Sequence, residues 1–137
     1  MRKNKPHWQE GHLNGIGGKI EEGELPIDAM QREYEEEVVT PTGVDLEIKT
    51  EDWAQLCIWD YGQGCVWFYY TFVDNEEMLK LEQEANDIGE RFENWPLNEL
   101  LDTYNINNSK MIDNLRYLIP MALYKKTNEL IKVIEIA

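Results

Sequence analysis

The sequence predicts a layered sandwich of the α/β or α+β class. Three observations predict it: an amphipathic helix follows a glycine-rich segment, two β-rich runs meet at a glycine-containing turn, and a second long helix lies near the C-terminus. Helices interspersed with strands bury their apolar faces by packing as layers. The length of 137 residues and the hydrophobic content of 42% fit one domain, residues 1–137, with a core of its own.

The first helix is expected over residues 26–38. The glycine-rich stretch 11–24 indicates loops and tight backbone geometry before it. Pro26 suits the first helical position, and Pro41 ends the helix together with the glycine that follows. Four apolar residues recur at helical spacing and form the expected buried stripe: Ile27, Met30, Tyr34 and Val38.

A β-hairpin is expected next. Residues 54–59 and 65–73 are dense in aromatic and β-branched side chains, and residues 60–64 form the turn between them. Cys57 and Cys65 flank this turn and are expected to face each other across it. Two cysteines do not make a disulfide framework, so free thiols are expected.

The remaining elements are expected to be a short helix over residues 95–101, a long helix over 110–126 and a last strand over 130–136. Residues 74–93 show no regular pattern, and Pro120 kinks or restarts the long helix. The residues of the long helix that are expected to face inward are Leu115, Leu118, Ile119, Ala122 and Leu123.

The net charge restricts the expected partners. The formal charge of -14 makes a surface that repels polyanions, so neither a nucleic-acid polymer nor an anionic membrane is expected to bind. No apolar run approaches the roughly 18–20 residues that span a bilayer, and no secretory signal is recognisable. The expected location is the cytoplasm. Two histidines give little support for a zinc site.

Three glutamates of the first helix are candidate metal ligands. At 3.6 residues per turn, Glu33, Glu36 and Glu37 share one face, where their charges repel. A hard cation such as Mg²⁺ (or Mn²⁺) offsets this repulsion and also binds substrate phosphates. Arg32 stands four residues before Glu36 and can pair with it. A solvated acidic face is the alternative interpretation of the glutamates alone.

The same segment resembles the Nudix box, Gx5Ex7REUxEExGU, in which U is a bulky apolar residue. Gly18, Glu24 and residues 32–37 match it at every charged position. The resemblance implies an α/β/α sandwich with a mixed sheet, and hydrolysis of nucleoside diphosphates linked to another group. Val39 replaces the last glycine of the box. That position is not a cation ligand, so the chemistry is expected to survive.

The resemblance also implies residue roles. Cations held by the box glutamates polarise the diphosphate and lower the pKa of the attacking water. One further acidic residue from a later loop assists in such enzymes, and Glu84, Glu90 and Glu93 are candidates for it. The implied catalytic residues are Glu33, Glu36, Glu37, Arg32 and Glu90; the implied metal ligands are the three box glutamates and the carbonyl of Gly17; Gly18 and Glu24 have structural roles in the box.

The resemblance to the Nudix family also implies a first strand ahead of the segment that begins here at Met1. We expect this strand to be missing, replaced by residues 130–136, or supplied by a partner chain. An incomplete sheet exposes an unpaired edge, which favours a homodimer.

Residues 13–19 resemble the Asn-Gly-x-Gly-Gly-Lys stretch of MutT-like and oxidised-purine nucleoside triphosphatases. There the asparagine that matches Asn14 helps to read the base, while a plain Asn-Gly turn is the alternative role. Asn114 loosely resembles a residue that lines the base pocket in that group. The residues expected to bind substrate are therefore Asn14, Gly18, Lys19 and Asn114.

The leading hypothesis is an Mg²⁺-dependent pyrophosphohydrolase that converts nucleoside triphosphates, with oxidised purine nucleotides as one candidate class, to monophosphate and pyrophosphate. The alternatives are ADP-ribose, dinucleoside polyphosphates or a capped RNA 5′ end as substrate, the last opposed by the acidity. A nucleotide-binding Nudix module with little or no catalysis is the alternative from another class.

Overall fold

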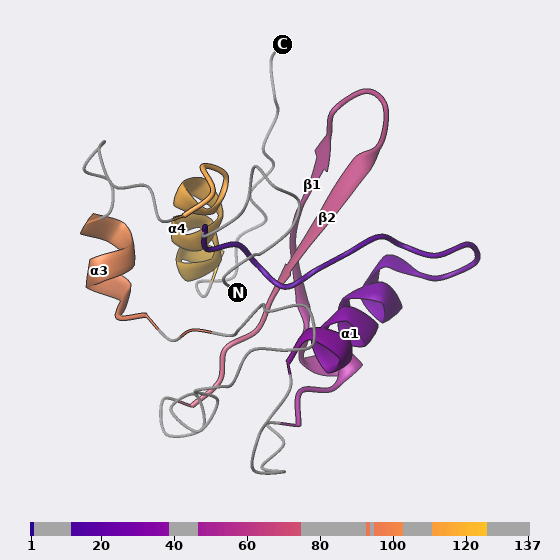
Figure 1. Ribbon diagram of the computed structural model, residues 1–137, viewed down its shortest axis with the longest axis horizontal. Coiled ribbons are helices and arrows are strands. Elements are labelled where there is room, and N and C mark those ends of the chain that lie inside the picture. Colours follow the sequence, from indigo (N-terminus) through magenta and orange to yellow (C-terminus); the bar gives the residue numbers. More distant parts are fainter. Residues whose placement is uncertain (2–11, 39–46, 75–92, 94, 103–110, 126–137) are drawn as a thin grey trace.

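The structure is a computed structural model, and it describes residues 1, 12–38, 47–74, 93, 95–102 and 111–125 (Figure 1). The helices are α1 (Pro26–Glu37), α3 (Leu97–Asp102) and α4 (Leu115–Lys125), with a single 3₁₀ turn η2 (Thr50–Asp52). The strands are β1 (Ala54–Asp60) and β2 (Cys65–Tyr70). The first helix, the hairpin and the short helix are therefore confirmed, with ends that differ by a few residues. The expected strand 130–136 lies outside the described residues.

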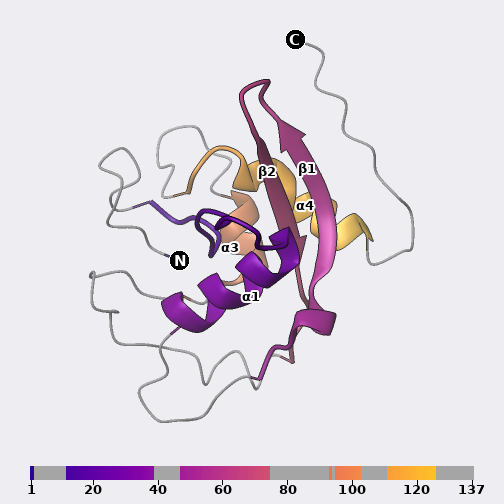
Figure 2. The same cartoon turned by 90° about the vertical axis from the view of Figure 1, so that its right-hand side faces the viewer.

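The hairpin lies between two helices. In Figure 1, α4 lies on one side of the β1–β2 ribbon and α1 on the other, and the rotated view in Figure 2 shows the same order. α1 contacts β2, and α4 contacts β1. Because successive side chains of a strand point to opposite faces of the sheet, α1 covers the side chains on one face of the hairpin and α4 covers those on the other. The α/β/α layering expected from the sequence is thus confirmed.

A bulge shapes the start of the hairpin. Gln55 pairs with Tyr69 and Cys57 pairs with Phe68, which leaves Leu56 as an extra residue on β1. Leu56 is only 3% exposed. Lys125, at the end of α4, donates from Nζ to the carbonyls of Gln55 and Leu56 at 2.7 and 2.6 Å. The carbonyls at the bulge therefore keep hydrogen-bond partners, and α4 is held against β1.

The tip of the hairpin corrects the prediction for the two cysteines. Gly62 takes a left-handed φ of 81° and donates its N–H to Asp60 Oδ1 at 2.7 Å, which closes the turn. Because this turn sets the register, Cys65 pairs with Asp60 and Cys57 lies opposite Phe68. The expectation that the cysteines face each other is therefore wrong, although both are free thiols as expected.

A third pairing links the N-terminal segment to the chain before α4. Leu13 and Met111 form a parallel bridge, and the N–H of Ile112 donates to the carbonyl of Leu13 at 2.9 Å. Leu13 and Met111 are 6% and 3% exposed, so the pairing lies in the core. This parallel bridge is separate from the sheet of the described residues, which consists of the antiparallel strands β1 and β2.

The long C-terminal helix begins later than predicted. Its expected start at residue 110 is wrong, because Met111 pairs with Leu13 and the chain then turns before Leu115. Pro120 lies inside α4, and Leu118 is buried as expected. Leu123 is 37% exposed, which corrects its predicted inward position.

The buried side of α1 differs in part from the predicted stripe. Tyr34 is 7% exposed as expected, whereas Ile27, Met30 and Val38 are only half-buried. Ala29, at 4%, is the other buried residue of the helix. The contact face is thus rotated toward Ala29, which leaves the glutamates of the helix on the remaining surface. No helix among the described residues is long and apolar enough to cross a membrane.

Candidate functional site

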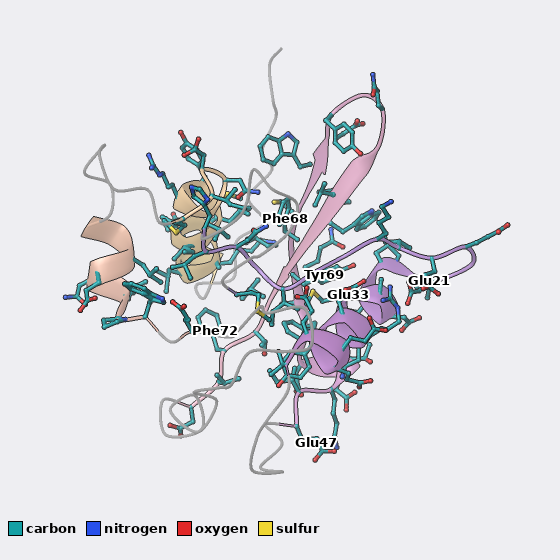
Figure 3. The ribbon with its side chains drawn as sticks, viewed as in Figure 1. Glu21, Glu33, Glu47, Phe68, Tyr69 and Phe72 are labelled. Atoms are coloured by element: carbon teal, nitrogen blue, oxygen red, sulfur yellow. The ribbon has the colours of Figure 1, made fainter. Side chains whose placement is uncertain are left out.

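The loop before α1 brings Glu24 to the side of the helix. Gly23 takes a left-handed φ of 81°, and the N–H of Glu24 donates to the carbonyl of Glu21 at 3.1 Å. The N–H of Glu21 in turn donates to Glu24 Oε2 at 2.9 Å. Glu21 is labelled in Figure 3, in the loop near the N-terminal end of α1. This reciprocal pair orders the loop and presents the second carboxylate oxygen to Arg32.

Arg32 is the centre of the site. Its Nε and Nη2 donate to the two oxygens of Glu24 at 2.9 and 3.1 Å, a bidentate pairing. Nη1 donates to Glu33 at 2.8 Å and to Glu36 at 3.3 Å, and Nη2 also donates to the Lys19 carbonyl at 2.9 Å. A single guanidinium therefore joins the loop to two of the predicted metal ligands, which confirms the expected pairing of Arg32 with Glu36.

The accessibility of these side chains differs. Glu24 and Glu33 are 15% and 14% exposed, whereas Glu36 is 59% exposed. An exposed ion pair at 3.3 Å contributes little to stability and exchanges readily with other partners. Glu36 therefore has the weakest and most exposed of the contacts that the acids of the cluster make with Arg32.

The pairing has an electrostatic consequence for Glu24. The hydrogen bond from Arg32, followed by that from the backbone of Glu21, lowers the pKa of the Glu24 carboxyl below its usual value. The same bonds to Glu24 and then Glu33 raise the pKa of Arg32. Both groups are charged at neutral pH, so the loop is tied to the helix by an ion pair.

Removing this pair is expected to change how stability depends on pH. Because the folded pKa of Glu24 is depressed, its contribution is present above the unfolded value of about 4.3 and is lost as pH falls below it. The difference in free energy of unfolding between wild type and Glu24→Gln should be constant above about pH 5 and shrink toward pH 3. Urea denaturation across this range measures it. Glu22→Gln, at an exposed neighbour, is the control. A difference that stays constant down to pH 3 contradicts the assigned role.

Only glycine fits at position 18, because the carboxylate of Glu33 approaches the backbone there closely. A Cβ at this position would overlap the carboxylate of Glu33. Glycine therefore lets the loop backbone lie against the acid that Arg32 holds. Glu37 closes the cluster from the other end, because its Oε2 accepts a hydrogen bond from the N–H of Gly17 at 3.2 Å. The structure thus brings together Gly17, Gly18, Glu24, Arg32, Glu33, Glu36 and Glu37, as the sequence predicted.

The remaining predicted residues are more scattered. Asn14 accepts the N–H of Gly15 on Oδ1 at 2.8 Å, and Lys19 is exposed in the loop. Asn114 precedes α4, and its Oδ1 is buried without a hydrogen-bond partner in the structure. Glu93 accepts from Trp95 Nε1 at 2.9 Å. Glu84 and Glu90 lie outside the described residues.

The donor set fits a hard divalent cation. It consists of carboxylates and the Gly17 carbonyl, all oxygen donors of the kind that Mg²⁺ and Mn²⁺ prefer. The missing Cβ at Gly18 leaves the space in which the Glu33 carboxylate lies. Among the described residues, no three His, Cys, Asp or Glu side chains already surround a common point. Arg32 and Gly17 hold the carboxylates instead, so binding a cation requires exchange of these contacts.

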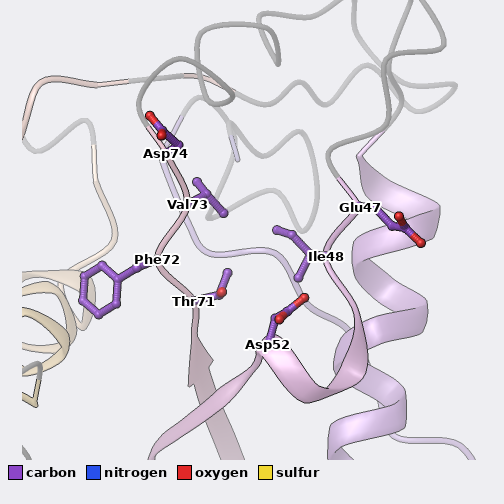
Figure 4. Close-up of a pocket in the computed structure, with 7 residues that line it drawn as sticks. All are labelled: Glu47, Ile48, Asp52, Thr71, Phe72, Val73 and Asp74. Atoms are coloured by element: carbon purple, nitrogen blue, oxygen red, sulfur yellow. The ribbon is translucent and has the colours of Figure 1, made fainter.

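A pocket with acidic residues in its lining lies next to β1 and β2. This pocket of about 330 Å³ separates the segment before β1 from the segment after β2, and Figure 4 shows Asp52 and Thr71 beside it. Asp52 accepts the N–H of Lys49 at 2.8 Å, and Glu47 pairs with the Lys49 ammonium at 3.6 Å. These acids have local partners, and Asp74 beside them adds negative charge that repels phosphate.

The loop, the shared guanidinium and the helix glutamates gather oxygen donors that fit a hard cation beside a glycine-rich loop. The NUDIX domain model matches residues 1–115, and the chain belongs to the NUDIX family. An RNA pyrophosphohydrolase of Francisella tularensis subsp. mediasiatica is 32% identical over 106 residues, and one of Francisella philomiragia subsp. philomiragia is 34% identical over 106 residues. Each alignment covers 69% of this chain and 63% of the relative. No solved structure matches.

Proposed function

We propose that this chain is an Mg²⁺- or Mn²⁺-dependent pyrophosphohydrolase that cleaves nucleoside triphosphates to a monophosphate and pyrophosphate. The observation that carries the proposal is the set of hydrogen bonds from the Arg32 guanidinium. They connect Glu24 of the loop to Glu33 and Glu36 of α1. A solvated acidic helix face needs no such bidentate anchor. Membership of the NUDIX family supports the same chemistry.

Each side chain of the cluster has a distinct task. Glu33, Glu36 and Glu37 supply the oxygen ligands, and Arg32 holds Glu33 in one orientation at 2.8 Å. A bound Mg²⁺ neutralises the diphosphate and lowers the pKa of the attacking water. Lys19 is exposed beside the cluster and supplies a positive charge for a phosphate oxygen.

The buried oxygen of Asn114 supports recognition of a base. A buried acceptor without a partner costs roughly 1–3 kcal/mol, so a ligand that donates an N–H there gains affinity. Asn114 precedes α4 and follows the Met111 pairing with Leu13, which adjoins Asn14. Both asparagines of the predicted substrate set therefore flank one paired segment, and we assign them to the nucleobase.

The 5′ end of RNA is the second candidate substrate, because the two Francisella relatives carry the name RNA pyrophosphohydrolase. The charge of -14 opposes it, since a polyanion needs a basic track. Of the basic side chains in the described ranges, Arg32, Lys49, Arg116 and Lys125 have partners within the chain. Lys19 is thus the described cation best placed for a phosphate, which suits a small nucleotide.

A nucleotide panel tests the proposal. Phosphate and pyrophosphate release is measured from the four dNTPs, 8-oxo-dGTP, ADP-ribose, a dinucleoside polyphosphate and a 5′-triphosphorylated oligonucleotide, with Mg²⁺, Mn²⁺ or EDTA. Metal-dependent pyrophosphate release from a nucleoside triphosphate supports the leading function. Preference for the oligonucleotide selects the second candidate substrate. If the folded protein releases neither phosphate nor pyrophosphate from any substrate, the result selects a binding module without catalysis.

Asn14→Ala separates base recognition from a plain turn. The variant is expected to raise KM severalfold for purine triphosphates and little for pyrimidine triphosphates, because an amide pairs with a purine edge through donor and acceptor together. Steady-state kinetics with matched purine and pyrimidine substrates measure this. Asn98→Ala, on the exposed side of α3, is the control. An equal rise for both substrate classes leaves Asn14 with the turn alone.

A further inference from the structure

The amide of Gln31 joins α1 to the segment that leads into β1. Its Oε1 accepts a hydrogen bond from Trp53 Nε1 at 2.8 Å, and its Nε2 donates to the Ile48 carbonyl at 2.8 Å. The same nitrogen donates to Glu35 Oε1 at 2.8 Å. Both N–H groups and the carbonyl oxygen of one half-buried side chain are therefore satisfied, and two of the three bonds leave the helix.

Trp53 contacts α1 a second time through its ring. It packs edge-on against Tyr34, with centroids 5.6 Å apart and planes at 68°. Tyr34 is 7% exposed, and Gln31 lies three residues before it on the same side of the helix. A polar and an apolar contact thus fix the indole on α1, so neither rotation nor sliding of the helix leaves both contacts intact.

This contact lies away from the glutamate cluster. At about 100° per residue, Gln31 is separated by roughly 120–160° around the helix axis from Glu33, Glu36 and Glu37. Gln31 therefore does not reach a cation or phosphate held by these acids. A glutamine at a helical position carries no functional signature in the sequence, because its role depends on partners that are distant in the chain.

We propose that Gln31 is a positioning residue, which sets the rotation of α1 at which the box glutamates face the loop at residues 17–19. The inference rests on the function proposed above. Arg32 binds the helix to the loop on one side, and Gln31 binds it to Ile48 and Trp53 on the other. Losing either restraint frees the helix to turn, and a misplacement of about 1 Å costs up to about a hundredfold in rate.

Two variants remove the bonds in different ways. Gln31→Met keeps the length of the side chain and removes all three hydrogen bonds. Trp53→Phe keeps a six-membered ring against Tyr34 and removes the indole N–H together with the five-membered ring that carries it. Ala29→Gly is the matched control, because it loosens the same helix through backbone entropy at a buried position outside the network.

Two readouts separate positioning from general stability. In the first, kcat and KM are measured for the best triphosphate below the melting temperature of every variant. In the second, Mn²⁺ affinity is measured without nucleotide by electron paramagnetic resonance. Gln31→Met is expected to lower kcat about tenfold, leave KM within about twofold and weaken Mn²⁺ binding about tenfold, the scale for partners that orient metal ligands. Trp53→Phe should do the same to a smaller extent, and the double variant should match Gln31→Met.

The proposal is overturned if Mn²⁺ affinity is unchanged in both variants. It is equally overturned if Ala29→Gly, at the same loss of melting temperature, shows the same fall in kcat. If Gln31→Met does not fold, Trp53→Phe decides by the same two criteria. If the wild type binds Mn²⁺ but cleaves nothing, the proposed function fails separately, and the difference in Mn²⁺ affinity alone supports or overturns the role of Gln31.

Discussion

Replacing Glu37 with glutamine is expected to lower metal-dependent turnover by about a hundredfold or more, because loss of a ligand costs at least as much as loss of a group that orients one. The fold should remain. Glu37 Oε2 accepts the N–H of Gly17 at 3.2 Å, and an amide oxygen at the same place still accepts it. The change removes one negative charge and leaves the local hydrogen bond.

The measurement is kcat/KM as a function of Mg²⁺ concentration, together with the melting temperature. Glu36→Gln should behave in the same way, since Glu36 is the exposed member of the cluster. Asp28→Asn is the control, because Asp28 is an exposed carboxylate in the first turn of the same helix and occupies a position that the box pattern leaves unspecified. Turnover that survives in Glu37→Gln at wild-type Mg²⁺ dependence means that this residue is not a ligand.

Gly18→Ala is expected to disable the site by displacing Glu33. The new Cβ would occupy the place of the Glu33 carboxylate, which is the mobile end of a long side chain. The acid can therefore rotate away while the backbone stays in place, but it then loses its 2.8 Å bond to Arg32. We expect a loss of about 10–100-fold in kcat/KM and in Mn²⁺ affinity, with a small change in melting temperature.

Gly15→Ala is the matched control in the same loop. A Cβ at Gly15 meets no atom within 4 Å, so this variant should keep the wild-type rate and metal affinity. Activity assays and Mn²⁺ titration on the two variants, side by side, distinguish a steric effect at Gly18 from a general stiffening of the loop. Equal losses in both variants, or none in either, contradict the packing explanation.

The local sequence pattern was sufficient to predict the helices and strands that depend on residues near one another in the chain. Pro26 and the apolar spacing after it predicted α1, and the turn at Gly62 between two β-rich runs predicted the hairpin. The resemblance of Gly18, Glu24 and Arg32 to the Nudix box predicted the cluster, and a loop and a helix that are adjacent in the chain bring these residues together at short range. Helical periodicity alone placed Glu33, Glu36 and Glu37 on one face.

The errors arose where distant segments meet. The predicted start of the long helix at residue 110 is wrong, because Met111 pairs with Leu13 across the fold, and helix propensity carries no information on that partner. The cysteine prediction is wrong because the register of the hairpin follows from the turn rather than from the positions of the thiols. The buried side of α1 includes Ala29, since the packing partner and not the apolar spacing fixes the contact face.

The sequence by itself therefore determined the order of elements, the acidic helix face and the loop that carries Glu24, since all of these depend on spacing along one stretch of chain. Only the tertiary structure decided that Arg32 binds Glu24 with two bonds, that Glu33 lies where a Cβ at residue 18 would be, and that Gln31 binds Trp53 and Ile48. The physical reason is that these contacts need positions fixed to within a hydrogen-bond length, and the packing of α1 against β2 and the segment before β1 supplies that precision.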